Sequence, residues 1–157
     1  IVTKGDVLGH RSLFSDKTLH ATATAMEDSR VCFIDKTYIM GLIQEQPSVA
    51  LHVIEKLSRD MGSAEHRLTS MHSKNVRERL AELLLLLKES HGVKVDNGVK
   101  IDLRLTREEM ATMIGTAPET LIRFMGEFKE AGLIAQEGKT IIIQDNEKLI
   151  SWTGTEL

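Results

Sequence analysis

Two charged side chains near the start of a short amphipathic segment can form specific hydrogen bonds with a ligand. Glu119 and Arg123 are four residues apart, so on a helix they lie one turn apart on the same face. An arginine guanidinium can donate two hydrogen bonds to guanine, and a glutamate carboxylate can accept one from the cytosine amino group. The alternative is an ordinary surface ion pair between the two residues. Their place on the first outward turn favours base reading.

The segment that carries these residues, 105–134, predicts two helices joined by a tight turn. Thr106 and Glu109 have the spacing of a capping box, in which hydroxyl and carboxylate satisfy amide groups at the start of a helix. Gly115 suits the left-handed conformation that ends a helix. Pro118 suits the first turn of the next helix, where no amide hydrogen is needed.

The second helix should bury one face and end at Gly132. Its predicted inner residues are all apolar: Leu121, Phe124, Met125 and Phe128. Two short apolar runs then flank residues 137–139, which predicts a β-hairpin with a glycine turn. Two helices followed by a hairpin predict a winged helix-turn-helix, whose second helix can enter a DNA major groove.

This arrangement divides the candidate DNA contacts into two groups. The predicted base-reading residues are Glu119, Ile122 and Arg123. The predicted contacts to the DNA backbone are polar and lie around the helices and the hairpin turn: Thr106, Thr116, Thr120, Lys139 and Thr140.

Composition alone would not suggest DNA. The chain has a formal net charge of −3, and residues 74–139 hold eleven Lys and Arg against eleven Asp and Glu. A winged helix used for protein–protein contact, without DNA reading, is therefore the alternative function. No phosphate loop, zinc-ligand spacing or nucleophile–base–acid set is present, so we predict neither an enzyme nor a metal site. The single cysteine, Cys32, fits a cytoplasmic protein, and no apolar run predicts a membrane segment.

The N-terminal part is predicted to be mostly β-structure. Residues 20–26 and 30–34 alternate or run apolar, as antiparallel strands do, and Cys32 should then be a small buried side chain. Three or so strands are too few for an independent sheet. They either belong to the end of a larger β domain, which we favour, or borrow strands from a partner. A short helix should follow over 35–46.

A long helix over 48–72 carries an apolar stripe with nearly heptad spacing. Such a stripe on an otherwise polar helix predicts a partner helix, most simply a second copy of this chain; packing against the chain's own β domain is the alternative. The predicted interface residues are Val49, Val53, Leu57, Met61, Ala64, Leu68 and Met71.

The remaining elements complete the C-terminal domain. A helix over 75–90 with a broad apolar face should underlie the helix pair, and a hairpin should turn at residues 96–98. A short last helix should pack Leu149 and Trp152 inward.

The order of these elements resembles the CRP/FNR family of bacterial transcription regulators. The resemblance is carried by GDVLGHRSLF, VRERLAELLLLL, LTREEMATMIGTAPETLIRFMGEF and GLIAQEGKTIII. It implies an α+β chain in three parts: the end of a cyclic-nucleotide-binding-like β-roll sensor domain (1–46, its N-terminal part absent), a dimerisation helix (47–73) and a winged helix-turn-helix domain (74–157). It also implies a homodimer that binds double-stranded DNA under effector control, and that contacts RNA polymerase if it is an activator.

The family's recognition helix contains Glu-Thr-x-x-Arg, here Glu119 to Arg123, and in the family the glutamate and arginine read base edges. Pro118 stands where the cyclic-AMP-responsive branch has arginine, so the site is closer to the FNR-like branch.

The resemblance also bears on the effector. The cyclic-AMP branch has Gly-Glu and Arg-Ser around its nucleotide, and the matching positions here are Gly9-His10 and His20-Ala21. Cyclic AMP binding is therefore not expected, and the cofactor stays unknown. His10 is a candidate haem ligand, with a loop histidine as the alternative. An iron–sulfur cluster would depend on cysteines before residue 1.

Overall fold

The computed structural model describes residue 2 and residues 4–15, 22–26 and 28–154. The chain divides into two compact units, with the boundary between His66 and Arg67. The division into parts at residues 46 and 73 stays a prediction.

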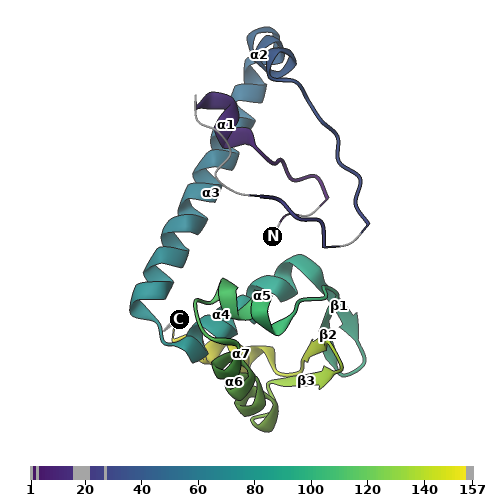
Figure 1. Cartoon of the computed structure of the whole chain (residues 1–157), viewed down its shortest axis with the longest axis vertical. Coiled ribbons are helices and arrows are strands. Elements are labelled where there is room, and N and C mark those ends of the chain that lie inside the picture. The colour runs from purple at the N-terminus through teal and green to yellow at the C-terminus, as the bar shows by residue number, and fades with distance from the viewer. Residues whose placement is uncertain (1, 3, 16–21, 27, 155–157) are drawn as a thin grey trace. The chain divides into compact units, whose positions relative to one another are not determined.

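The first unit contains α1 (His10–Phe14), α2 (Lys36–Glu45) and most of α3 (Pro47–Ser73). Asp35 caps α2, because its carboxylate accepts a hydrogen bond of 2.8 Å from the Thr37 amide. The prediction of a short helix followed by a long one is confirmed, and Figure 1 shows α3 as one unbroken helix. Within the described ranges, no helix is both long and apolar enough to cross a bilayer.

The predicted N-terminal strands are not found in the described residues. Residues 22–26 and 28–34 form no strand, and residues 20 and 21 lie outside the described ranges. Val31 is 78% and Phe33 90% exposed, and Cys32 is exposed rather than buried. A strand needs a neighbour for its amide and carbonyl groups, and no described segment pairs with this one, so its alternating pattern has no sheet to bury it.

The second unit is built on α4 (Val76–His91), which confirms the predicted helix over 75–90. Asn75 and Glu78 form a capping box at its start. Five of its apolar residues are buried, and they form one core with the helices and strands that follow. The largest fully buried side chains of this core are Leu80, Leu84, Leu87, Met110, Leu121, Phe128, Leu133, Ile134, Ile143 and Leu149.

A four-stranded antiparallel sheet covers one side of this unit (Figure 1). Its strands are β1 (Gly92–Val95), β2 (Gly98–Ile101), β3 (Ile134–Glu137) and β4 (Thr140–Ile143), in the order β1-β2-β4-β3. Both predicted hairpins are confirmed. The pairing of β2 with β4 joins them, with Lys100 opposite Ile142.

Between the hairpins lie α5 (Arg107–Met113) and α6 (Pro118–Glu130), as the capping and glycine signals predicted. Gly115, with φ of +63°, makes the turn between them, and the Thr116 amide donates to the Ala111 carbonyl over 2.9 Å. The last helix, α7 (Asn146–Ser151), buries Leu149 and is followed by Trp152, whose ring meets Phe128 edge-on at 5.0 Å.

The capping box of α5 predicts an acid-sensitive contribution to stability. Two hydrogen bonds from Thr106, first from its amide, hold the pKa of Glu109 below its ordinary value of 4.5. Because the folded pKa is depressed, this stability is fully present above about pH 4.5 and is lost as pH falls through the folded value. Glu109→Gln should therefore lose less stability on acidification than the wild type in urea unfolding. Glu108→Gln, on the neighbouring residue outside the cap, should follow the wild type.

Candidate nucleic-acid interface

The outward face of α6 presents the three predicted base-reading residues together. Glu119 and Arg123 are exposed, and Ile122 between them is 54% exposed. The opposite face of the helix is held in the core by side chains that are at most 4% exposed: Leu121, Met125 and Phe128. Burial on one side therefore fixes which side chains α6 offers to a groove.

Arg123 is stacked rather than ion-paired. Its guanidinium carbon lies 4.8 Å from the centre of the Phe124 ring. Within the described part of the chain no ion pair joins Arg123 to Glu119, so the surface ion pair weighed from the sequence is not what the structure shows. The hydrogen-bonding groups of both residues are available to a ligand.

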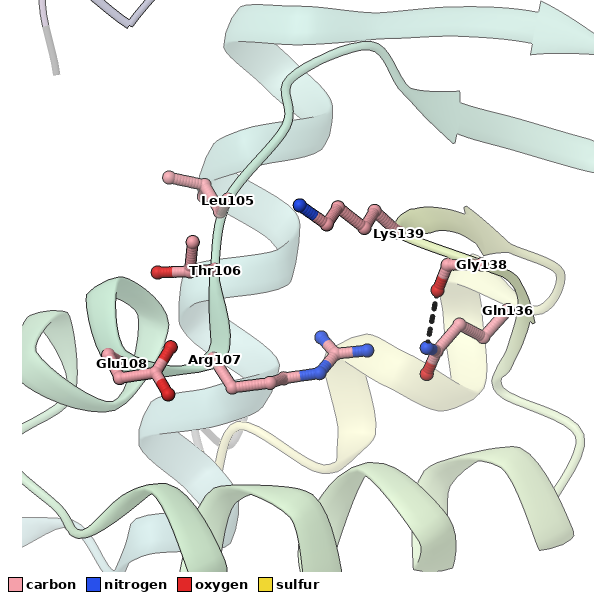
Figure 2. A pocket seen from close by; sticks show the side chains of 7 residues that line it. All are labelled: Leu105, Thr106, Arg107, Glu108, Gln136, Gly138 and Lys139. Carbon is pink, nitrogen blue, oxygen red and sulfur yellow. Dashed lines mark hydrogen bonds between the residues drawn. The ribbon is translucent and has the colours of Figure 1, made fainter.

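A second feature is a cavity of about 330 Å³ between the start of α5 and the β3–β4 turn. Two of the predicted backbone contacts, Thr106 and Lys139, line it together. The other lining residues are Leu105, Arg107, Glu108, Gln136 and Gly138. Figure 2 shows the Lys139 chain extending from the turn toward Thr106, and the Arg107 guanidinium extending toward Gln136.

The cavity has a positively charged side that the sequence did not single out. Arg107 is half-buried, and desolvation lowers the pKa of its guanidinium from the ordinary value without removing its charge. Gln136 donates a hydrogen bond of 2.7 Å to the Gly138 carbonyl and so braces the turn that carries Lys139. The position of Arg107, directly after the cap residue Thr106, was the available signal for it.

The remaining predicted backbone contacts lie elsewhere in this unit. Thr116 is in the turn before α6, Thr120 is in the first turn of α6, and Thr140 begins β4. All three are half-buried, and none of them lines the cavity. The cavity thus brings together only part of the predicted set.

The predicted interface stripe on α3 is unevenly exposed. Met61 and Leu68 are 64% and 69% exposed, whereas Val49, Val53 and Leu57 are half-buried in the chain itself. Ile54, which was not among the predicted residues, is 57% exposed. The three exposed residues recur every seven positions, and Leu57, Ala64 and Met71 follow each of them by three. That is the a and d pattern of a coiled coil. The sequence reasoning missed Ile54, which its strict heptad spacing could have identified.

His10 has acceptors on both sides of its ring. Its Nδ1 lies 3.2 Å from the Val7 carbonyl oxygen, and its Nε2 lies 2.8 Å from Oδ2 of Asp60 on α3. Although the contact with Asp60 is short, Nε2 is buried and makes no hydrogen bond in this structure. The assignment of His10 as a haem ligand stays a prediction. No cluster of three metal-ligating side chains occurs among the described residues, and His20 lies outside them.

Two family models match the chain. The model of the cyclic nucleotide-binding domain matches residues 1–46, and the model of the Crp-like helix-turn-helix domain matches residues 78–152. The second match covers the elements that carry the exposed face of α6 and the cavity beside the β3–β4 turn.

Curated relatives agree with these matches. A "CRP-like cAMP-activated global transcriptional regulator" of Mycobacterium tuberculosis is 26% identical over 149 residues, which are 95% of this chain and 66% of that protein. The "Fumarate and nitrate reduction regulatory protein" of Escherichia coli is 26% identical over 151 residues, which are 96% of this chain and 60% of that protein. The chain therefore spans less than two thirds of the length of these relatives. Both are regulators rather than enzymes, as the sequence predicted for this chain.

A solved structure supports the same assignment. A mutant of CooA from Carboxydothermus hydrogenoformans aligns with a TM-score of 0.69 and 28% identity, over 76% of this chain and 55% of that chain. A long helix, α3, lies between the residues that match the cyclic nucleotide-binding domain and those that match the Crp-like helix-turn-helix. The chain belongs to the CRP/FNR family of transcription regulators.

Proposed function

We propose that this chain is the DNA-reading and dimerising part of a homodimeric, effector-controlled transcription regulator of the cytoplasm. The observation that carries the proposal is the outward face of α6, where Glu119 and Arg123 are exposed without an ion pair between them. In this role Glu119, Ile122 and Arg123 contact base edges in the major groove.

Contacts to the DNA backbone would come from residues around α5, α6 and the wing. Lys139 and Thr106 share the cavity, and Arg107 adds a second cationic side chain there. Thr116, Thr120 and Thr140 would add hydroxyl donors to phosphate oxygens. These contacts are local, which fits a domain whose total charge is close to neutral.

Dimerisation would use the heptad stripe of α3. Two copies of a helix with exposed Ile54, Met61 and Leu68 can bury these side chains against each other. A two-fold dimer presents two copies of α6, so the operator would be an inverted repeat. A regulator of this kind that activates transcription would also contact RNA polymerase.

The alternative, a winged helix that binds another protein, is favoured only by the neutral charge of residues 74–139. A gel-shift titration with an inverted-repeat operator, repeated over a range of salt concentrations, separates the two functions. If the protein reads DNA, its affinity should fall steeply as the salt concentration rises, because binding to phosphates releases counterions. Absence of a shifted complex at low salt would support the protein-binding function instead.

Lys139→Ala should weaken binding to all DNA sequences about equally. One phosphate contact is lost, so the slope of log affinity against log salt should become shallower by about one. Lys94→Ala is the matched control. It removes the same charge from β1, at the sheet edge opposite the wing, and should keep the wild-type slope. Equal slopes for all three proteins would remove Lys139 from the interface.

Cyclic AMP should give no saturable heat of binding to the full-length protein in titration calorimetry. The reason is that Gly9-His10 and His20-Ala21 replace the residues that hold the nucleotide in the cyclic-AMP-responsive branch of the family. The mycobacterial relative named as cAMP-activated is the positive control. A dissociation constant in the micromolar range would show that these positions were matched incorrectly, and that the effector is cyclic AMP after all.

A further inference from the structure

Glu127 lies where it could interfere with Arg123. It follows Arg123 by four residues, so the two side chains are neighbours on the surface of α6. The other side chains three or four positions from Glu127 are Phe124, Glu130 and Ala131. Arg123 is therefore the only cation among these neighbours on the helix. If Glu127 paired with it, the guanidinium would be occupied when α6 reached a base pair.

The structure gives Glu127 a different partner. Nη2 of Arg77, near the start of α4, lies 3.1 Å from Oε2 of Glu127, with the two side chains 49% and 37% exposed. The Arg77 guanidinium carbon also lies 5.3 Å from the centre of the Trp152 ring. Arg77 thus has an aromatic contact as well as an ion pair beside α6.

The same aromatic group links Arg77 to Arg123. The Phe124 ring has the Arg123 guanidinium carbon 4.8 Å from its centre and the Arg77 guanidinium carbon 5.9 Å from its centre. Arg77 thus neutralises the carboxylate one turn beyond Arg123, and it contacts the ring on which Arg123 is stacked. Within the described residues Arg123 makes no ion pair of its own.

We infer that Arg77 is a positioning residue for DNA reading: it holds Glu127 away from Arg123, which leaves the stacked Arg123 guanidinium for a guanine edge. This inference rests on the proposed function, because it assigns a role only if α6 reads DNA. It predicts that losing the Arg77 charge weakens specific binding through Glu127, and not through a lost contact between Arg77 and the DNA.

The test is a double-mutant cycle in the full-length protein, in which fluorescence anisotropy measures binding to two DNAs. The first DNA is the operator that the wild type selects from a random pool. The second is the same operator with its anchoring G·C pair replaced. Arg77→Met keeps an apolar chain against Trp152 while removing the charge. It should bind the operator about fivefold more weakly as a dimer, since Glu127 can now pair with Arg123 in each half-site. It should also discriminate less between the two DNAs.

Adding Glu127→Gln to Arg77→Met should restore affinity and discrimination to within about twofold of the wild type. Adding Glu130→Gln instead, which removes the same charge from the next turn of α6, should restore neither. Arg77→Lys, which keeps a cation near Glu127, should lose less than Arg77→Met. Glu127→Gln alone should bind at least as tightly as the wild type. Thermal unfolding of every variant shows whether a loss of DNA affinity results from lower folding stability.

Three outcomes would overturn the inference. The first is that Arg77→Met binds the operator as tightly as the wild type. The second is that the Glu127→Gln addition fails to restore binding while the salt slope becomes shallower by about one, which would make Arg77 a direct phosphate contact. The third is that Glu127→Gln and Glu130→Gln restore the binding of Arg77→Met equally, which would show that only the net charge of the protein matters. Failure of the wild type to bind any operator would instead contradict the proposed function.

Discussion

Replacing Arg123 with alanine should weaken binding to the preferred operator by about 1–3 kcal/mol per half-site. The expected loss is large because the guanidinium can donate two hydrogen bonds to one guanine, and alanine offers none. Resemblance to the FNR-like branch suggests half-sites containing TTG or TGA, with the G·C pair as the main anchor. Selection from a random DNA pool should recover such an inverted repeat with the wild type, and Arg123→Ala should lose the preference at that pair.

The matched control is Lys129→Ala on the same helix. Lys129 is exposed, and it lies in the last turn of α6, about two turns beyond Ile122. Its loss should lower affinity for all sequences slightly and leave the selected repeat unchanged. Should wild type and Arg123→Ala recover the same repeat with equal strength, Arg123 does not read bases.

The helix-turn-helix was predictable from sequence because each of its signals is local. The capping residues Thr106 and Glu109 act within one turn, and Gly115 and Pro118 act on their own backbone angles. The structure has the two helices that these residues predict, and the inner face of α6 follows from helical spacing alone.

The prediction of N-terminal strands was wrong because a strand depends on residues outside its own segment. An alternating pattern shows only that a segment could lie in a sheet, whereas a strand forms only when another segment supplies hydrogen-bond partners. In the described residues around Cys32 no such partner is present, and the side chains are exposed.

Contacts between distant residues gave no sequence signal. Arg77 and Glu127 are 50 positions apart, and no sequence motif pairs the two. Arg107 and Gln136 come together only because the β3–β4 turn folds back beside the start of α5. Spacing along one helix could show that Glu127 neighbours Arg123, but not which residue of another helix would neutralise it.

Dimerisation is the remaining large effect, and it can be tested at the exposed positions of α3. Met61→Glu combined with Leu68→Glu should convert a dimer to monomers in sedimentation experiments. Two apolar side chains that are 64% and 69% exposed in the single chain would otherwise be buried against a partner, and the substitutions place like charges there instead.

The monomer should also lose affinity for the full inverted repeat by about 100-fold or more, because one protein can no longer engage both half-sites at once. Its affinity for a single half-site should stay close to that of a wild-type subunit, since α6 is unchanged. Ser63→Glu combined with Thr69→Glu adds the same charge outside the heptad stripe and should remain dimeric. A wild-type chain that stays monomeric at tens of micromolar would exclude α3 as a self-association helix.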